Sequence, residues 1–488
     1  MSERKMQFSL FETRRFLFYL VSLSIFLLFF SCFALLRSSS SSSLIPESVL
    51  MLMVVNNTSV LSNRGFSSKS IPNLFSPMAP ATFLKSKEND KVRRGCDSAQ
   101  AILKVYMYDL PTEFHFGLLG WKGKKNQIWP NTSDLNHLPS YPGGLNLQHS
   151  VEYWLTLDLL ASDYPNASRP CTAIRVHDSN LADVIFVPFF SSVSYNRHSK
   201  VHGKEKISKD KMLQDKLVKF LRDQKEWKKS AGRDHLIMAH HPNSLLDART
   251  QLGYAMFLLA DFGRYPVEIA NIKKDIIAPY KHVVSSIKKY SATFEARRIL
   301  AYFQGAIIRK DVILCIFQDG MIRQELYRLL KDEKDVHFAY GAPSGNGISR
   351  TGEGMALSKF CLTIAGDTPS SNRLFDAIVS LCVPVIISDE IELPFEDVLD
   401  YSEFAVFVQA SDAINEGFLV NLLRGINRDK WMKMWTRLKE VAHHFEYQYP
   451  SKEGDAVGMI WKAVARKLSH VRLRIHKENR FHRYQIRQ

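Results

Sequence analysis

The chain has 488 residues, of which 45% are hydrophobic and 23% are charged, a balance that excludes a mainly disordered chain, a collagen or a small disulfide scaffold. At roughly 150 residues per domain, this length allows two to three domains. The 65 Lys and Arg residues outnumber the 49 Asp and Glu residues, which by itself would favour an anionic partner such as a nucleic acid, a membrane surface or an acidic substrate. About nine of these cations lie in residues 462–488 beside one Glu, so the body of the chain is only mildly basic and we expect no nucleic-acid partner.

An uncharged apolar segment at Phe16–Leu36 predicts a single membrane-spanning helix, because its roughly 21 residues can cross a hydrocarbon layer of roughly 30 Å. The cations before it are Arg4, Lys5, Arg14 and Arg15. Positively charged flanks stay in the cytoplasm. We therefore expect a cytoplasmic tail at 1–15, an uncleaved signal anchor at 16–36, and the rest of the chain in a lumen or outside. A cleaved signal peptide is the alternative, but its apolar region is usually only 7–15 residues long.

Residues 37–100 are rich in Ser, Asn, Pro and Lys and have no sustained periodicity, which predicts a disordered stem. A lumenal location would allow N-glycosylation. Sequons occur at Asn56, Asn57, Asn131 and Asn166.

Beyond residue 101, short apolar runs alternate with helical patterns. Runs of this kind are typical of strands buried on both faces of a parallel sheet. The expected strands are Lys104–Tyr108, Val184–Val187, His235–Ala239, Phe257–Ala260, Ile299–Phe303, Val336–Tyr340, Phe360–Ala365, Val383–Ser388 and Phe404–Val408. The expected helices include Lys211–Lys228, Met321–Lys331, Asn372–Leu381, Lys430–His443 and Asp455–Leu468. We expect an α/β fold with two Rossmann-like domains facing a cleft, at 101–290 and 291–445, and a C-terminal helix and basic tail at 446–488.

The cysteines outside the apolar segment are Cys96, Cys171, Cys315, Cys361 and Cys382. Cys361 begins one expected strand, and Cys382 comes just before the next. Neighbouring parallel strands lie roughly 4.8 Å apart, which suits a disulfide, and a lumen is oxidising. We therefore predict a Cys361–Cys382 disulfide. Cys96–Cys171 is a second candidate pair, which leaves Cys315 unpaired.

The most informative segment is Phe360–Phe395, which is predicted to run strand, loop, helix, strand. Gly366 permits a tight turn after the first strand. Thr368 is the expected helix cap, and Pro369 suits the first helical position. The backbone N–H groups of Ser370 and Ser371 would then point beyond the carboxyl end of the strand, where phosphates bind in doubly wound sheets.

Arg373 and Asp376 follow on one face of that helix. A cation in the first turn opposes the helix dipole unless an anion is bound, so Arg373 suggests a diphosphate ligand. The Asp376 carboxylate could accept hydrogen bonds from both ribose hydroxyls of a nucleotide. The alternative is an Arg373–Asp376 surface pair on an ordinary Rossmann helix. The segment has neither the GxGxxG pattern nor a P-loop.

This segment resembles the signature of the exostosin glycosyltransferases, and the plant branch that includes arabinan arabinosyltransferase-like proteins is the most similar. Further similar stretches within residues 100–470 are Val105–Pro111, Gln148–Leu155, Ala182–Phe190, Gly232–Ile237, Tyr302–Gly305 and Glu392–Val398. The resemblance implies a GT-B fold, a nucleotide-sugar donor bound by the C-terminal domain, an acceptor bound by the N-terminal domain, and inversion at the anomeric carbon.

No Asp-x-Asp motif occurs in the chain, so we expect no metal cofactor. Helix N–H groups and cations would instead neutralise the donor diphosphate. Arg373 is the first candidate, and Arg309 and Lys310, just after the turn at Gly305, are the second. A solvated basic loop is the alternative for Arg309 and Lys310.

An inverting transfer needs a base that takes the proton of the acceptor hydroxyl. The candidates in the N-terminal domain are Asp234 and His235 beside an expected strand, and Glu152 and His149 at the start of a helix. Each of them could equally be structural. His240 and His241 have no second ligand pair at a metal-site spacing. Trp121, Trp129 and Trp154 could stack on sugar rings or pack in the core.

These features predict an inverting glycosyltransferase that is anchored in the Golgi membrane as a single-pass type II protein. The expected donor is a UDP-sugar that carries a pentose or hexose such as arabinose, xylose or galactose, and the expected acceptor is a cell-wall polysaccharide or glycan. Residues 311–320 are apolar and depart from the family pattern. They motivate the alternative of a catalytically inactive lumenal partner or scaffold of other glycosyltransferases.

Overall fold

The computed structural model describes most of the chain from Cys96 onward. The described residues are 96, 99–133, 137–164, 168–201, 203, 205–263, 265–287, 291–307, 319–341, 347–366 and 368–485. They belong to the unit that spans Asn89–Gln488. Several predicted features lie outside the described residues, namely the cytoplasmic tail, the signal anchor, nearly all of the stem, Asn56, Asn57, Asn166, Arg309, Lys310 and Cys315.

Six parallel strands form the first sheet, in the order β2-β1-β3-β4-β5-β6. The strands are β1 (Leu103–Met107), β2 (Ala173–Val176), β3 (Val184–Val187), β4 (His235–Met238), β5 (Met256–Leu259) and β6 (Ile276–Ile277). The helices of this part are α3 (Val151–Ala161), α4 (Ser191–His198), α5 (Lys209–Asp223), α6 (Lys225–Ser230) and α7 (Leu246–Gln251). Every residue of β3, β4 and β5 is buried, as expected for strands with both faces covered.

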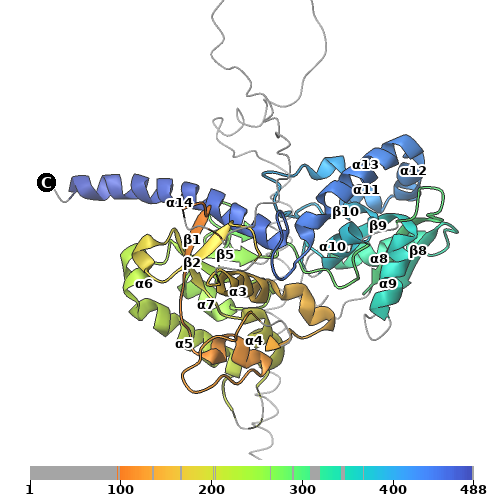
Figure 1. The fold of residues 1–488 in the computed structure, drawn as a ribbon. Helices are drawn as coiled ribbons and strands as arrows, with labels where there is room; N and C mark the ends of the chain where they lie inside the picture. Colours follow the sequence, from red (N-terminus) through yellow and green to blue (C-terminus); the bar gives the residue numbers. More distant parts are fainter. Residues whose placement is uncertain are drawn as a thin grey trace, which may run out of the picture. The chain divides into compact units, whose positions relative to one another are not determined.

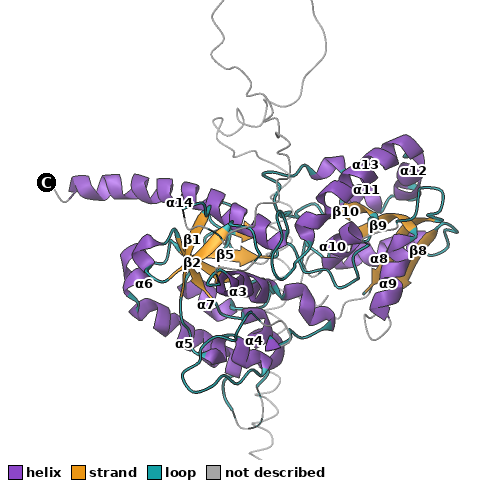
Figure 2. Ribbon diagram, in the orientation of Figure 1, coloured by secondary structure: helices purple, strands orange, loops and turns teal. Residues whose placement is uncertain are grey.

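Five parallel strands form the second sheet, in the order β11-β10-β9-β7-β8. The strands are β7 (Ile299–Gly305), β8 (Val336–Tyr340), β9 (Ser358–Ile364), β10 (Val383–Ile387) and β11 (Val406–Phe407). The helices are α8 (Asp319–Leu330), α9 (Gly347–Ala356), α10 (Asn372–Val379), α11 (Ala410–Ala413), α12 (Phe418–Gly425) and α13 (Arg428–Val441). Helices surround the strands of both sheets (Figure 2). The α/β class with parallel sheets is therefore confirmed.

The C-terminal helix α14 (Ala456–Gln485) returns from the second sheet to the first, where it packs against α3, β1 and β6 (Figure 1). The indole Nε1 of Trp461 donates to Asp158 Oδ2 of α3 at 3.0 Å, and the Trp461 ring lies 5.9 Å from that of Phe186 in β3. Arg472, further along α14, pairs with Asp183 at 2.9 Å. Helix α14 therefore packs against the elements of the first sheet, although it follows the second sheet in the chain.

Both candidate disulfides are present. Cys361 and Cys382 are bridged, with their Cα atoms 5.8 Å apart. Cys361 lies in β9 and pairs in register with Pro384 of β10, so the reasoning from neighbouring strands is confirmed. Cys96 and Cys171 form the second bridge, with a Cα separation of 5.2 Å.

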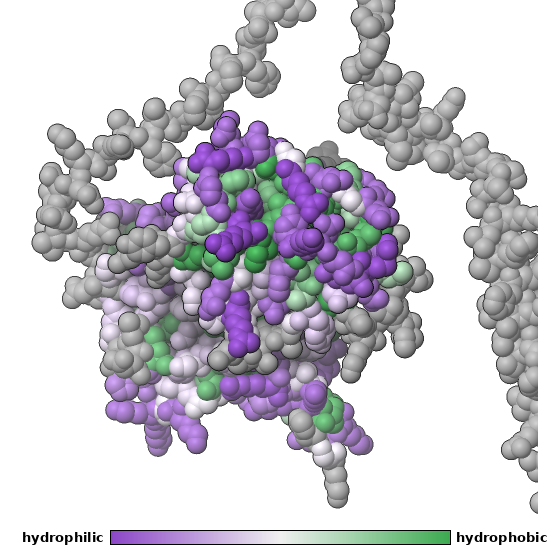
Figure 3. Space-filling view, turned by 90° about the vertical axis from the view of Figure 1, so that its right-hand side faces the viewer, coloured by the Kyte–Doolittle hydropathy of each residue, from purple (hydrophilic) through white to green (hydrophobic). Residues whose placement is uncertain are grey.

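Among the described residues, no helix is long and apolar enough to span a membrane. The face of the molecule in Figure 3 is mainly hydrophilic, with apolar patches scattered over it.

Candidate active site

A cavity of about 540 Å³ lies where the carboxyl ends of β7, β8 and β9 face the loops that follow β4 and β6. In open parallel sheets, ligands bind outside the carboxyl ends of the strands, at the point where the strand order reverses. In the second sheet the order reverses between β7 and β9. The cavity therefore occupies the position at which a nucleotide is expected.

The N-terminus of α10 opens into this cavity. The helix begins at Asn372, and its cap is Ser371, whose side-chain oxygen accepts from the backbone N–H of Arg373. The prediction that Thr368 caps the helix and Pro369 begins it is therefore wrong. Thr368 instead donates its hydroxyl to the Ser370 carbonyl at 3.1 Å, within the loop that leads to the cap. Ser370 and Ser371 line the cavity, beyond the carboxyl end of β9, where the sequence placed them.

Arg373 lies across the end of β7. Its Nε donates to the Gln304 carbonyl at 2.8 Å, and its guanidinium carbon is 5.1 Å from the centroid of the Phe303 ring. A Cβ atom on Gly305 would lie only 1.9 Å from Arg373 Nη2, so the glycine makes room for the guanidinium. Arg373 is thus held within the cavity and does not form the surface pair that was the alternative.

A second arginine of the cavity, Arg323 in α8, was not predicted. Its side chain is 2% exposed and donates to the carbonyls of Ile364 at 2.7 Å, Ala365 at 2.9 Å and Ala306 at 3.1 Å. It thereby ties the ends of β7 and β9 together. A Cβ atom on Gly366 would lie 2.6 Å from Arg323 Nη2. An arginine in the middle of a helical pattern gives no sequence signal of such a position.

Asp376 lines the cavity and also holds the connection between the two sheets. Its Oδ1 accepts from the backbone N–H groups of Val283 at 2.7 Å and Val284 at 3.2 Å, and its Oδ2 accepts from Asn372 Nδ2 at 2.8 Å. Burial raises the pKa of Asp376 to about 6, and these backbone hydrogen bonds oppose the shift. Asp376 is therefore not on the helix surface, because its side chain is buried and supports the chain at residues 283–284.

Three polar side chains connect the two sheets beside the cavity. The Ser370 hydroxyl donates to Asp261, which follows β5, and lies 2.9 Å from the hydroxyl of Tyr280, which follows β6. All three side chains are buried. Burial, reinforced by the charge of Asp261, raises the pKa of Tyr280 above its usual value, so Tyr280 keeps its proton. The α10 end of the second sheet is thereby fixed against the first sheet.

Three histidines lie on the first sheet's side of the cavity, and their hydrogen bonds determine their tautomers. His240 Nε2 contacts the Ala278 carbonyl at 3.1 Å, so it must carry a proton, and His240 Nδ1 then accepts from His149 Nδ1 at 3.0 Å. Burial is the main cause that lowers the pKa of His240 to about 3 and the pKa of His149 well below its usual value. His241 Nδ1 accepts from the backbone N–H of Asn243 at 3.1 Å. Neutral His241 therefore presents an N–H donor rather than a base.

Comparison with known proteins identifies the family. A family model described as the Exostosin GT47 domain matches residues 99–425. The probable arabinosyltransferase ARAD1 of Arabidopsis thaliana is 37% identical over 436 residues, which cover 89% of this chain and 91% of that protein. The chain belongs to the exostosin GT47 family.

Membership makes this GT47 chain a glycosyltransferase. The probable glucuronoxylan glucuronosyltransferase F8H of Arabidopsis thaliana is 27% identical, with 75% of this chain and 73% of that protein covered. Among solved structures, Anabaena Alr3699/HepE in complex with UDP and glucose is 10% identical and covers 75% of this chain and 99% of its own, with a TM-score of 0.32.

Of the predicted base candidates of this GT47 chain, His149 lines the cavity, whereas Asp234, His235 and Glu152 lie outside it. Asp234 and His235 lie at the amino end of β4, whereas the cavity meets the loop after its carboxyl end. His235 is buried, with Nε2 2.9 Å from the Tyr108 hydroxyl and Nδ1 2.7 Å from Asp234 Oδ1. The pair therefore fixes the start of a strand.

Glu152 is also structural. It is fully buried in α3 and accepts from the backbone N–H groups of Ser192 at 3.1 Å and Val193 at 3.2 Å and from the Tyr141 hydroxyl at 3.1 Å. Burial raises the pKa of Glu152 to about 8. The carboxyl group holds the first turn of α4 and cannot reach an acceptor.

The remaining predicted residues lie away from the cavity. Trp129 stacks on His115 at a ring distance of 4.2 Å, Trp154 donates to Ser150 Oγ at 2.9 Å, and Trp121 packs against the core. The sequon residue Asn131 is exposed. In the part of the chain that the structure describes, no group of three or more His, Cys, Asp or Glu side chains is placed to hold a metal ion.

Proposed function

We propose that this protein is an inverting glycosyltransferase that moves a sugar from a UDP-sugar donor to a cell-wall polysaccharide or glycan acceptor. The donor sugar is a pentose or hexose such as arabinose, xylose or galactose. The relatives named as arabinosyltransferase and glucuronoxylan glucuronosyltransferase support this class of reaction and acceptor.

The observation that carries the proposal is Arg373, fixed inside the cavity beside the N-terminus of α10. A guanidinium and exposed helix N–H groups bind phosphate oxygens without a metal ion. The buried Arg323 adds a second positive charge at the ends of β7 and β9. Asp376 can contribute one ribose contact through Oδ2, which has a single partner, Asn372 Nδ2, whereas its Oδ1 accepts from both Val283 and Val284.

The groups that bind the diphosphate also stabilise the charge that develops during sugar transfer. The acceptor hydroxyl oxygen attacks the anomeric carbon from the face opposite the leaving group, the bond to the diphosphate oxygen breaks with its electron pair, and the hydroxyl proton is released to solvent water. Negative charge then grows on the diphosphate, where the preorganised cation and N–H dipoles stabilise it. Of the histidines that line the cavity, His241 can orient a hydroxyl group as a donor, whereas His149 donates Nδ1–H to His240 and accepts at Nε2 from Gln148 Nε2 at 3.1 Å.

A donor screen tests the proposal. The purified full-length chain is incubated with individual UDP-sugars, with and without oligosaccharide acceptors, and released UDP is measured. We expect release from one donor, stimulated by an acceptor. A folded protein that neither releases nor binds UDP would instead support the lumenal scaffold suggested by residues 311–320.

We also propose a single-pass type II location in the Golgi membrane, with residues after Leu36 in the lumen. The support is the uncharged segment at Phe16–Leu36 and the cations before it. Protease added to sealed microsomes should spare most of the chain, and digestion of that bulk would refute the orientation.

A further inference from the structure

A second cavity, of about 1190 Å³, lies at the opposite end of the first sheet from the active-site cavity. Its lining residues include Arg233, Tyr254 and Lys273, which precede β4, β5 and β6 respectively. The other wall is the segment of α14 from Lys467 to Lys477. We call this cavity the α14 groove. The active-site cavity meets the loops after the carboxyl ends of β4 and β6, so the two cavities are separate.

The α14 groove is strongly basic. Its Lys and Arg residues are Arg233, Lys273, Lys274, Lys467, Arg474 and Lys477, with His470 beside them. Glu268 is the one carboxylate among the described residues that line it. Lys274 is neutralised by the buried Asp275 at 2.8 Å, and Lys467 donates to the Ile272 carbonyl. Lys273, Arg474 and Lys477 are exposed to solvent.

Three cations of α14 that do not line the groove form ion pairs with carboxylates from other parts of the chain. Lys462, Arg466 and Arg472 each form an ion pair, with Glu453, Asp397 and Asp183 respectively. These pairs fasten the helix to the rest of the protein. The residues that line the groove include six Lys or Arg and one carboxylate, Glu268, so they create a positive potential there even though Lys274 is paired with Asp275.

Exposed apolar side chains accompany these charges. Tyr254 is 67% exposed, Val267 68% and Ile272 57%. The Arg233 guanidinium carbon lies 4.8 Å from the centroid of the Tyr254 ring. A recess that combines an exposed aromatic ring with cations suits a ligand that has apolar C–H faces and regularly spaced anionic groups.

We propose that the α14 groove binds an acidic polysaccharide, in which uronate carboxylates meet the cations and sugar rings lie against Tyr254. The predicted stem is a poor occupant because residues 37–95 carry eight Lys or Arg against three Asp or Glu. A lipid surface fits less well, since the exposed apolar residues line a recess. This site goes beyond the proposed transfer reaction, because binding here needs neither donor nor turnover.

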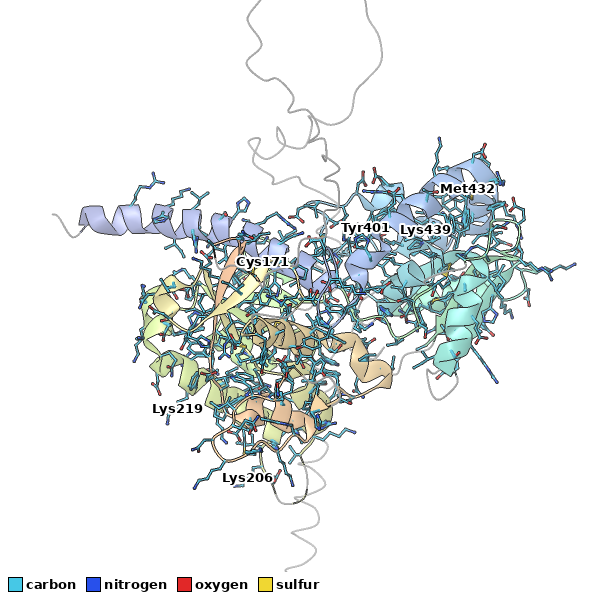
Figure 4. The ribbon with its side chains drawn as sticks, in the orientation of Figure 1. Cys171, Lys206, Lys219, Tyr401, Met432 and Lys439 are labelled. Atoms are coloured by element: carbon cyan, nitrogen blue, oxygen red, sulfur yellow. A yellow bond between two sulfur atoms is a disulfide. The ribbon has the colours of Figure 1, made fainter. Side chains whose placement is uncertain are left out.

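The test measures binding of an oligogalacturonate of about ten residues to the full-length chain in detergent. We expect Lys273→Ala/Arg474→Ala/Lys477→Ala to weaken binding on the order of ten- to thirtyfold. The matched control, Lys206→Ala/Lys219→Ala/Lys229→Ala, removes the same charge from exposed lysines. Figure 4 shows Lys206 and Lys219 on the side of the first sheet away from α14. The control should bind as the unmodified chain does.

A second variant separates the polysaccharide from a membrane. Tyr254→Ala leaves the charge unchanged, so it should weaken oligogalacturonate binding several-fold and leave binding to phosphatidylserine vesicles unaltered. Thermal unfolding of each variant verifies folding. The proposal is overturned if the groove variant binds oligogalacturonate normally or if the control loses as much affinity. It is equally overturned if the groove variant loses only vesicle binding.

Discussion

Two glycines determine where the cavity arginines lie. Gly305 is the last residue of β7 and Gly366 follows β9, the two strands at which the order of the second sheet reverses, and each glycine is covered by a guanidinium. A side chain at either position would occupy the volume that Arg373 or Arg323 now fills. Both glycines therefore affect the cavity by making room for the arginines.

Gly305→Ala should displace Arg373, because the added methyl group would lie 1.9 Å from Nη2. We expect turnover to fall about ten- to a hundredfold, close to the effect of removing the guanidinium, because a charge-assisted contact contributes about 1.5–3 kcal/mol. The control is Gly425→Ala in α12, where an added Cβ atom meets nothing within 4 Å. Steady-state kinetics and thermal unfolding of both variants check this. Normal turnover of Gly305→Ala would show that the guanidinium position does not matter.

Asp376 should make the free energy of unfolding depend on pH. Its pKa is raised from 3.8 to about 6 in the folded chain, so the folded state binds the proton more tightly than the unfolded state does. The resulting stabilisation is fully present below pH 3.8 and is lost as the pH rises through about 6, a change of about 3 kcal/mol. Asp376→Asn removes this titration.

The measurement is denaturant unfolding of both proteins between pH 4 and pH 7. The unmodified chain should lose stability relative to Asp376→Asn as the pH rises, and a constant difference would contradict the assignment. Asp376→Ala should cost more than Asp376→Asn at every pH, because it leaves the N–H groups of Val283 and Val284 without this acceptor.

At the scale of elements, apolar runs predicted the strands well. β3 and β8 have the predicted bounds, and β1, β4, β5, β7, β9 and β10 are shifted at their ends by one or two residues. β2 and β6 were missed because neither forms a recognisable apolar run. β2 has only four residues, one of which is Arg175, and β6 consists of two isoleucines. The expected strand Phe404–Val408 shrinks to two residues, and the expected helix Lys211–Lys228 is divided at Gln224, whose backbone is extended.

The helix termini were harder to predict. α14 continues 17 residues beyond the predicted end at Leu468. Val471, Leu473 and Ile475 alternate with polar residues as in a strand. In the helix, however, Val471 is buried on the same face as Val464 and Leu468, and Leu473 is exposed. The expected helix Asn372–Leu381 has the observed start of α10, but its cap was misplaced by three residues because Ser371 competes with Thr368, and only the loop geometry decides between them.

The Cys361–Cys382 bridge should stabilise the β9–α10–β10 unit. It closes a loop of 21 residues, for which loop entropy predicts about 3 kcal/mol. The double variant Cys361→Ala/Cys382→Ala should lower the free energy of unfolding by about that amount, measured without reductant. Dithiothreitol should then destabilise the unmodified chain more than the variant. An equal effect on both would mean that the bridge contributes nothing.

At the scale of the whole molecule, the predictable part of the site is the part encoded locally. Ser370, Ser371, Arg373 and Asp376 reach the cavity because one strand, loop and helix carry them. The predicted base role of Asp234, His235 and Glu152 was wrong because a position next to a strand or helix does not show which end of that element faces the cleft. His235 begins β4, whereas His241, after its carboxyl end, lines the cavity. Arg323 depends on contacts between distant segments, which no local pattern reports.

The most direct test of the account is UDP binding by Arg373→Ala in the folded full-length chain, measured by calorimetry. The control is Arg328→Ala, which removes an exposed arginine of α8 that pairs with Glu325 on the same helix. We predict that Arg373→Ala weakens UDP binding about ten- to a hundredfold, that Arg373→Lys restores it only in part because the planar fork is lost, and that Arg328→Ala binds normally. Unchanged affinity of a folded Arg373→Ala protein would contradict the placement of the donor diphosphate at α10.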